Sequence, residues 1–400
     1  MKTIALAFRY LWSRPLAAML NILLLTLGLA SITFVLLASE QVDRSFQRDL
    51  AGIDVVVGAK GSPMQLILAG VFHIDVPPGN IALEDVRQLQ AHPQVAKLIP
   101  LSLGDSFRGF RIVGTTPEYL SHYGMKFRDG QVWTQPMQAV IGAEVAAASA
   151  MKIGDAFTGN HGVGGGGDEH GNAPYKVTGV LERCGCVVDR LVLTSSESIW
   201  HVHEKAMATD KEDQKALEAA REITIALITY KSPMAAVSFP RFVNSKTAMQ
   251  AAAPAVEVTR LLRLLGVGSE VLRGIGAVLL LTAALSVFIA LWNAVRERRE
   301  DLAMLRMLGA TPAKVAALLV CEALWLAILA SILGLVAGHA LTAGAGYLLE
   351  AQRSLPLTGR IWLASEIWIP VAALSVATVA ALIPAISAYR VDVAQLLNAR

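Results

Sequence analysis

Apolar residues are concentrated in four long runs, and the chain between these runs is mixed in character. The runs lie at residues 16–39, 274–295, 315–349 and 366–388. Each reaches the roughly 20 residues that an α-helix needs to cross the hydrocarbon core of a bilayer. No run of that length occurs between residues 40 and 273. The pattern predicts an α-helical membrane protein with four transmembrane helices and a large domain inserted between the first and the second.

The inserted region, residues 40–254, contains only short elements. Its β-rich runs lie at residues 53–57, 109–113, 175–181, 191–194 and 223–229, and its helical runs at 83–91, 143–151, 195–203 and 211–220. Short strands and helices mixed in this way are typical of an α+β domain. We therefore predict that residues 40–254 form one extracytoplasmic α+β domain.

The helical pattern begins before the second apolar run. Residues 255–273 carry five charged side chains, so they are not expected to lie in lipid. We predict a helical stalk at 255–273 that continues the transmembrane helix at 274–295. One helix over both segments would be about 60 Å long, but the four glycines between positions 266 and 276 weaken the case for an unbroken helix.

Basic residues orient the chain in the membrane. The connection at residues 296–314 holds five lysines and arginines, whereas the loop at 350–365 holds two. Residues 1–15 combine Phe8 and Trp12 with basic residues, which predicts an amphipathic helix at the cytosolic interface. By the positive-inside rule, residues 1–15, 296–314 and the tail at 389–400 lie in the cytosol, and the inserted domain lies outside.

Composition agrees with a mixed chain of spans and a soluble domain. The 400 residues are 54% hydrophobic and 17% charged, and the net charge is +3. So small a charge does not indicate nucleic-acid binding. The sequence contains no phosphate-binding Gly-x-x-x-x-Gly-Lys-Ser/Thr motif and no His-Glu-x-x-His or Gly-x-Ser-x-Gly motif. We therefore expect a protein that is not an enzyme, with any ATP hydrolysis in another polypeptide.

The segment at residues 296–312, between the second and third apolar runs, is the most distinctive in the chain. Charged residues are dense in its first half, and Leu302, Leu305 and Leu308 follow at three-residue spacing. This spacing predicts a short amphipathic helix that buries one face and presents the other at the cytosolic surface. The alternative is an ordinary basic loop that only sets the topology.

This segment resembles the coupling helix of the MacB/FtsX-type ABC transporter permeases, which include the lipoprotein-releasing LolC and LolE subunits. Two further segments, 140–155 and 384–397, resemble the outer domain and the C-terminal signature of that family, although Val393 replaces the usual proline. The residues that match the coupling helix are Arg298 or Arg299, Glu300, Leu302, Met304, Leu305, Leu308, Gly309, Ala310 and Thr311.

The resemblance implies a permease subunit in the bacterial cytoplasmic (inner) membrane, with its large domain in the periplasm. In that family the coupling helix relays the motion of a separate ATPase to the outer domain, for export or extraction of a lipoprotein, peptide or small molecule. The expected partners are an ABC ATPase that binds ATP and magnesium, a second permease subunit in a homodimer or related heterodimer, and a periplasmic or outer-membrane protein. The alternative function is an FtsX-like regulatory permease that switches an outer partner without transport.

Histidines and cysteines gather in one part of the outer domain, around a glycine-rich stretch at residues 159–172. Such side chains are ligands for zinc or copper, and this suggests a metal-linked transport system as a further possibility. Alternate positions along a strand would place each His-x-His or Cys-x-Cys pair on one face. A surface loop followed by unrelated strand residues is the alternative. The candidate ligands are His161, His170, Cys184, Cys186, His201 and His203.

Polar residues are rare in the third apolar run. An ionisable side chain there indicates a functional role, so we expect Glu322 to act at the cytosolic end of the helices or against the partner; snorkelling to the interface is the alternative. His339 is expected to be a polar packing residue. Gly334 and Gly338 have the spacing of close contacts between transmembrane helices.

Overall fold

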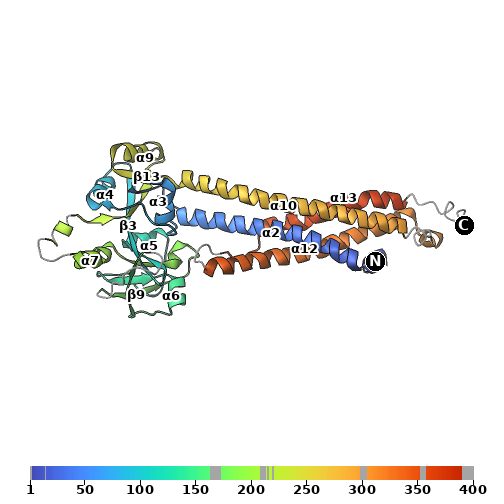
Figure 1. Cartoon of the computed structure of the whole chain (residues 1–400), viewed down its shortest axis with the longest axis horizontal. Helices are drawn as coiled ribbons and strands as arrows, with labels where there is room; N and C mark the ends of the chain where they lie inside the picture. Colours follow the sequence, from blue (N-terminus) through green and yellow to red (C-terminus); the bar gives the residue numbers. More distant parts are fainter. Residues whose placement is uncertain are drawn as a thin grey trace. The chain divides into compact units, whose positions relative to one another are not determined.

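The computed structural model divides into two compact units, which are described separately. It describes residues 2–13, 15–162, 173–207, 213, 216–218, 220–297, 304–351 and 357–389. One unit comprises Met1–Asp43 and Leu264–Arg400, and the other comprises Arg44–Arg263. We call them the helical unit and the outer domain (Figure 1).

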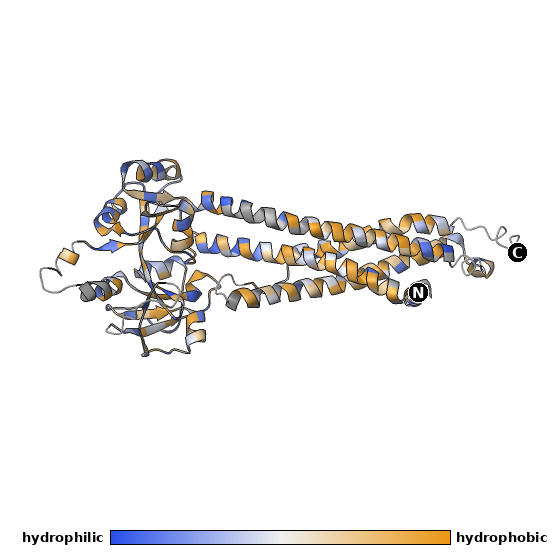
Figure 2. Ribbon diagram, in the orientation of Figure 1, coloured by the Kyte–Doolittle hydropathy of each residue, from blue (hydrophilic) through white to orange (hydrophobic). Residues whose placement is uncertain are grey.

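Long helices make up the helical unit. They are α1 (Lys2–Leu11), α2 (Pro15–Leu50), α10 (Pro254–Glu297), α12 (Pro312–Ala351) and α13 (Trp368–Tyr389), with the short 3₁₀ helix η2 (Ala364–Ile367) before α13. Within the described residues, α2, α10, α12 and the η2–α13 segment are long and apolar enough to cross a membrane, and Figure 2 shows hydrophobic residues along these helices. The prediction of four transmembrane helices is confirmed.

Helix α10 runs without interruption from Pro254 to Glu297, so the predicted stalk and the second transmembrane helix are one continuous helix despite the glycines between them. Gly276 lies against α2, where an added Cβ would come within 2.9 Å of the Ile32 side chain. Gly28 of α2 faces α10 in return, with the Leu280 nitrogen 3.2 Å from the position of its missing Cβ. These glycines therefore permit close packing of α2 and α10, and packing outweighs their low helix propensity.

Small residues also bring α12 close to α2. A Cβ on Gly334 would lie 2.6 Å from the Leu29 Cβ, and one on Gly338 would overlap Thr33. Alanines of α12 and α13 fill the rest of the bundle core, together with Leu25, Leu29, Val287, Leu291 and Leu326. The predicted role of Gly334 and Gly338 in helix contacts is confirmed.

The outer domain is built on one sheet with the strand order β13-β1-β12-β3-β4-β10-β6-β9-β5. The strands are β1 (Val55–Ala59), β3 (Val95–Phe107), β4 (Phe110–Thr115), β5 (Phe127–Gly130), β6 (Gln138–Ile141), β9 (Tyr175–Leu181), β10 (Leu191–Ser195), β12 (Ile225–Tyr230) and β13 (Met249–Ala252). β10 pairs with β4 and β6 pairs with β9 in parallel, and the other neighbours on this path are antiparallel. Outside this path, β7 (Ala156–Phe157) pairs with β9, β8 (Asn160–His161) pairs with β3, and β11 (Glu222–Ile223) pairs with β2 (Ile81–Ala82).

Strand β3 joins two lobes of the outer domain, because its first half pairs with β12 and its second half with β4. The first lobe buries Phe239, Val55 and Ile228 around β1, β12 and β13, and the second buries Tyr175 and Ile141 around β6, β9 and β10. The helices are α3 (Pro63–Gly70), α4 (Leu83–Gln90), α5 (Pro117–His122), α6 (Ala143–Ser149), α7 (Ser196–Met207) and α9 (Ala235–Lys246).

The predicted α+β class is confirmed, and several elements were missed. The sequence pattern did not indicate β3, because Pro100 and Gly104 interrupt its alternation. The predicted strand at residues 175–181 matches β9, and the predicted helix at 83–91 matches α4 to within one residue. The predicted helix at 211–220 lies largely outside the described residues.

The contact between α12 and α2 leads to a prediction. Replacing Gly338 with leucine should lower the amount of folded protein, because overpacking of a tight contact costs about 1–3 kcal/mol. Gly344→Leu is the matched control, since nothing lies within 4 Å of a Cβ at that position of the same helix. Membrane abundance and the thermal unfolding midpoint in detergent measure both variants; equal losses would show that Gly338 is not at a close contact.

Candidate functional site

The connection between α10 and α12 contains the residues for which coupling was predicted. Residues 298–303 lie outside the described part of the chain, so the predictions for Arg298, Arg299, Glu300 and Leu302 stay untested. Residues 304–307 are helical, and the Leu308 N–H donates to the Met304 carbonyl at 3.0 Å. The described part therefore contains the last turn of a short helix and the start of α12.

Gly309 ends this helix in a left-handed conformation, with φ of +95°. The Gly309 N–H donates to the Arg306 carbonyl at 3.0 Å, and the Ala310 N–H donates to the Leu305 carbonyl at 3.0 Å. These two hydrogen bonds define a Schellman motif, which favours glycine because the left-handed region is strained for other residues. After it Thr311 precedes α12, and Pro312 stands at the first helical position, where its missing N–H is not needed.

The motif divides the side chains of this turn between two directions. Leu305 and Ala310 are partly buried and pack against the core of the helical unit. Met304, Met307 and Leu308 are 51%, 56% and 85% exposed, and we call these three residues the coupling surface. The expectation that Leu308 buries on the same face as Leu305 is wrong, because the helix has already ended at Leu308.

Helix α1 packs beside the same end of α12. The Trp325 indole N–H donates to the Ile4 carbonyl at 3.2 Å, and the rings of Phe8 and Trp325 meet edge to face with centroids 5.2 Å apart. Leu11 joins the core against which Leu305 and Ala310 pack. The coupling surface therefore projects from a packed layer formed by α1, α12 and the turn at Gly309.

Glu322 is buried in α12, with 5% of its surface exposed. It lies in the half of α12 that starts at Pro312, and its predicted role at the cytosolic end stays a prediction. The predicted contact of Glu322 with a partner stays a prediction.

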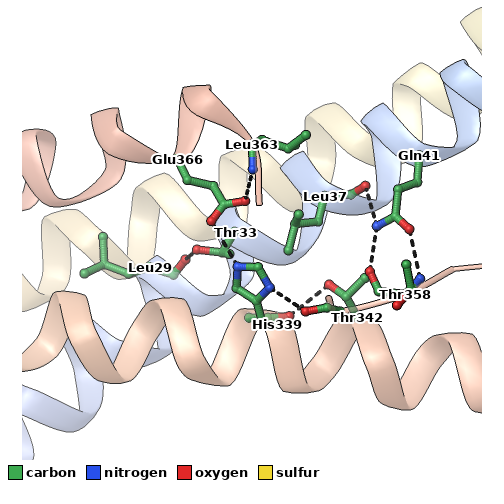
Figure 3. A network of polar contacts seen from close by, with 11 residues as sticks. Leu29, Thr33, Leu37, Gln41, His339, Thr342, Thr358, Leu363 and Glu366 are labelled. Atoms are coloured by element: carbon green, nitrogen blue, oxygen red, sulfur yellow. Dashed lines mark hydrogen bonds and ion pairs between the residues drawn. The ribbon is translucent and has the colours of Figure 1, made fainter. Parts of the chain in front are cut away.

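A polar cluster surrounds His339, in the half of α12 that ends at Ala351 (Figure 3). The two nitrogens of His339 contact the Gly359 carbonyl at 2.7 Å and Glu366 Oε2 at 2.9 Å. A carbonyl only accepts, so Nδ1 is the donor to Gly359, and Nε2 faces the Glu366 carboxylate. Gln41 of α2 also exchanges two hydrogen bonds with the backbone of Thr358. This cluster ties the loop before η2 to α2 and α12, which agrees with a packing role for His339.

In the outer domain, Cys184 and Cys186 form a disulfide. The Asp189 carboxylate accepts hydrogen bonds from the backbone N–H groups of Cys184 at 2.9 Å and Gly185 at 2.7 Å. The disulfide sulfurs are not thiolates, so they are not metal ligands in this form. The expectation that both cysteines lie on one face of a strand is wrong, because they flank a turn.

The last residues of α2 form hydrogen bonds with residues 185–187, in the turn that the disulfide closes; we call residues 184–187 the disulfide turn. Arg48 donates to the Gly185 carbonyl, and Asp49 Oδ1 accepts the Val187 N–H at 3.0 Å. The Tyr123 hydroxyl donates to the Asp49 carbonyl at 3.0 Å. We call these contacts the α2 junction, which fixes the end of α2 to the second lobe of the outer domain.

Of the four remaining metal-ligand candidates, only His201 has a side chain in the described part of the chain. His201 and His203 lie in helix α7 and not in a strand, so the strand expectation for this pair is wrong. The described residues contain no group of three side chains that could hold a metal ion. His170, and the side chains of His161 and His203, lie outside the described part, so metal binding by these three stays a prediction.

His73 is buried beside the α2 junction. Its Nε2 lies 3.1 Å from the Tyr119 hydroxyl, and the Tyr119 and Tyr123 rings are in contact with centroids 5.1 Å apart. Burial, together with the positive charges of Arg111 and Arg190, holds the pKa of His73 well below its ordinary value of 6.5. The folded domain therefore keeps His73 neutral.

Two family models match the chain. The one described as FtsX-like permease C-terminal matches residues 273–393, and the one described as MacB-like periplasmic core domain matches residues 18–255. The second match alone covers more than half of the chain. No curated protein matches the sequence.

Solved structures show a weaker likeness. The periplasmic region of MacB from Actinobacillus actinomycetemcomitans is 13% identical, with a TM-score of 0.35 over 53% of this chain and 95% of that one. The extracellular domain of the noncanonic ABC-type transporter YknZ from Gram-positive bacteria is 13% identical, with a TM-score of 0.31 over 49% of this chain and 98% of that one. Membership of a family is shown by the two family models.

The left-handed conformation at Gly309 leads to a prediction. Gly309→Val should lower the amount of folded protein in the membrane, because a β-branched residue is strained at this φ. Gly309→Asn should lose less, since asparagine tolerates left-handed backbone. Nothing lies within 4 Å of a Cβ here, so a steric clash does not contribute. Equal thermal unfolding midpoints for glycine and valine would contradict the Schellman turn.

The burial of His73 predicts a loss of stability at acid pH. Below about pH 6.5 the unfolded chain binds a proton at this residue and the folded domain does not, so the free energy of unfolding falls by up to about 1.4 kcal/mol per pH unit. His73→Asn should abolish that part of the pH dependence, and asparagine suits the positive φ of 55° at this position.

The measurement compares the thermal unfolding of the full chain in detergent at pH 7.5 and pH 5.5. The exposed His201 provides the control, because His201→Asn should keep the wild-type pH dependence. If wild type and His73→Asn lose the same stability between the two pH values, His73 is not held neutral by the fold.

Proposed function

Because the chain belongs to the MacB/FtsX-type ABC transporter permeases, we propose that it relays the ATP-driven motion of a separate ATPase to its extracytoplasmic domain. The observation that carries the proposal is the coupling surface. Three large apolar side chains are exposed on a turn that Leu305 and Ala310 anchor against the bundle core. A rigid turn with exposed apolar residues is suited to dock into a groove of a partner protein.

The anchoring of the turn is what makes it suitable for transmitting force. Leu305 and Ala310 pack against the core that α1 and α12 share, and the Schellman hydrogen bonds hold the backbone between them. A partner that moves the coupling surface would therefore move the start of α12 with it. A loop without such anchors would bend instead of transmitting the displacement.

Two continuous helices support a mechanical relay. Helices α2 and α10 each contribute residues to both compact units, and an α-helix is stiff because its backbone hydrogen bonds are internal. The α2 junction couples the end of α2 to the disulfide turn of the outer domain through Arg48 and Asp49. Motion of α2 would therefore reach the second lobe of that domain without an intervening flexible linker.

The proposed setting is the cytoplasmic membrane of a bacterium, with the outer domain in the periplasm and both termini in the cytosol. The proposed partners are the ATPase and a second permease subunit, identical or related, with a periplasmic or outer-membrane protein as a further partner. The proposed cargo is a lipoprotein, peptide or small molecule. A regulatory permease without cargo uses the same relay, and stimulation of the ATPase by cargo or by a periplasmic protein separates the two functions.

The coupling surface leads to a prediction about the ATPase. Leu308→Asp should leave the permease folded, because Leu308 is 85% exposed, but it should weaken the complex. Burying a leucine contributes about 1.5–3 kcal/mol, so its replacement by a charge should reduce affinity for the ATPase at least about tenfold. The measurements are co-purification with the ATPase and the rate of ATP hydrolysis by the complex in nanodiscs.

Met234→Asp is the matched control, because Met234 is 76% exposed and belongs to the outer domain, whereas the coupling surface belongs to the helical unit. It should preserve both membrane abundance and ATPase binding. If Leu308→Asp binds the ATPase fully and the complex hydrolyses ATP at the full rate, the turn only sets the topology of the chain. The proposal would then lose its main support.

A further inference from the structure

The outer domain contains a cavity of about 260 Å³ where its two lobes meet. Leu83 and Ile223 line it from the first lobe, and Trp133 and Ser196 line it from the second. Trp200 of α7 also lines the cavity and packs against the core of the first lobe. A molecule bound here would contact both lobes at once.

Ser196 is one of several polar residues that line this cavity, and the others are Thr115, Thr116, Thr134, Gln135, Ser195 and Glu197. Ser196 is the first residue of α7 and is 8% exposed, and its hydroxyl has no hydrogen-bond partner among the described residues. The neighbouring hydroxyls of Ser195 and Ser198 lie 3.0 Å apart and satisfy each other. A buried hydroxyl without a partner is unfavourable, so Ser196 is available to a bound molecule.

Two tryptophans provide the apolar walls. Trp133 is 6% exposed, so most of its ring is packed within the domain. The Trp200 indole N–H already donates to the Glu222 carbonyl at 2.7 Å, so that side chain offers its apolar surface and not a hydrogen bond. Arg221 stacks on the Trp200 ring at 4.9 Å, which holds the indole in place.

The charge and the hydrogen-bonding groups of the cavity wall indicate which kind of ligand fits. Glu197 also lines the cavity, and its negative charge disfavours a carboxylate or phosphate at the start of α7. A sugar carries several hydroxyl groups, and each would need a partner. Among the described lining residues, Ser196 supplies the one buried hydroxyl without a hydrogen-bond partner, and the Ser198 N–H in the first turn of α7 already donates to the Ser195 hydroxyl at 3.2 Å. A single neutral acceptor beside an apolar group suits these walls best.

We propose that this cavity binds one apolar side chain of an extended peptide segment, together with the backbone carbonyl beside it. The side chain packs between the tryptophans, Leu83 and Ile223, and the carbonyl accepts a hydrogen bond from the Ser196 hydroxyl. Recognition of this kind combines an apolar pocket with a few directed polar groups. The site is independent of the coupling surface, which belongs to the other compact unit.

The test measures peptide binding to the full chain in nanodiscs by isothermal titration. The probe is a tripeptide, acetyl-Gly-Leu-Gly-amide, which presents one apolar side chain and only neutral carbonyls. Acetyl-Gly-Gly-Gly-amide and N-acetylglucosamine are the comparison ligands. The leucine peptide should bind saturably and at least about tenfold more tightly than the glycine peptide, because only leucine fills the apolar part.

Three variants locate the site. Leu83→Trp should abolish binding by filling the cavity, and Ser196→Ala should weaken it roughly three- to tenfold by removing one hydrogen bond. Ser232→Ala is the control, since Ser232 is exposed and does not line the cavity. Without peptide, Ser196→Ala should not lower the thermal unfolding midpoint, whereas a structural role for this hydroxyl would lower it.

Three results would overturn the proposal. One is the lack of saturable binding of the leucine peptide, and another is binding that Leu83→Trp leaves unchanged. Tighter binding of N-acetylglucosamine than of the leucine peptide would assign the cavity to a sugar. None of these results affects the coupling proposal, which is measured on the ATPase.

Discussion

The close approach of α2 to α10 and α12 is the contact on which the helical unit depends. In lipid, apolar surface gains little by leaving its surroundings, so helices associate through close van der Waals packing and occasional polar contacts. Gly28 and Gly276 permit this approach on one side of α2, and Gly334 and Gly338 permit it on the other. Larger side chains at these positions would separate the helices and empty the core around Leu25 and Leu29.

The two ends of the bundle are held by different devices. At one end the Schellman turn at Gly309 directs Leu305 inward and Leu308 outward, so one backbone motif creates both an anchor and a docking surface. At the other end His339 and Gln41 bind the loop before η2 through directed hydrogen bonds. Buried polar groups of this kind are favourable only when they are paired, so they define one arrangement of the loop.

In the outer domain, contacts between residues that are distant in the sequence form both the proposed peptide cavity and the α2 junction of the proposed relay. Strand β3 joins the two lobes, and the cavity lies where the lobes meet. The α2 junction holds the disulfide turn of the second lobe. Binding of a peptide between the lobes would favour one arrangement of the lobes over others, and the α2 junction connects the second lobe to α2. The second lobe is therefore the part of the outer domain that both proposals involve.

The sequence by itself determined the features that depend on neighbouring residues. Uninterrupted apolar runs are sufficient to define four spans, and the three-residue spacing of Leu302, Leu305 and Leu308 is sufficient to predict an amphipathic helix between the second and the third span. Only the tertiary structure decided the disulfide between Cys184 and Cys186, the pairing of His339 with Glu366, the exposure of Leu308 and the cavity at Ser196. Most of these features join or enclose residues that are distant in the chain, and Leu308 is exposed because the backbone turns at Gly309. Periodicity reports which residues are apolar and at what spacing, but it does not report which elements meet.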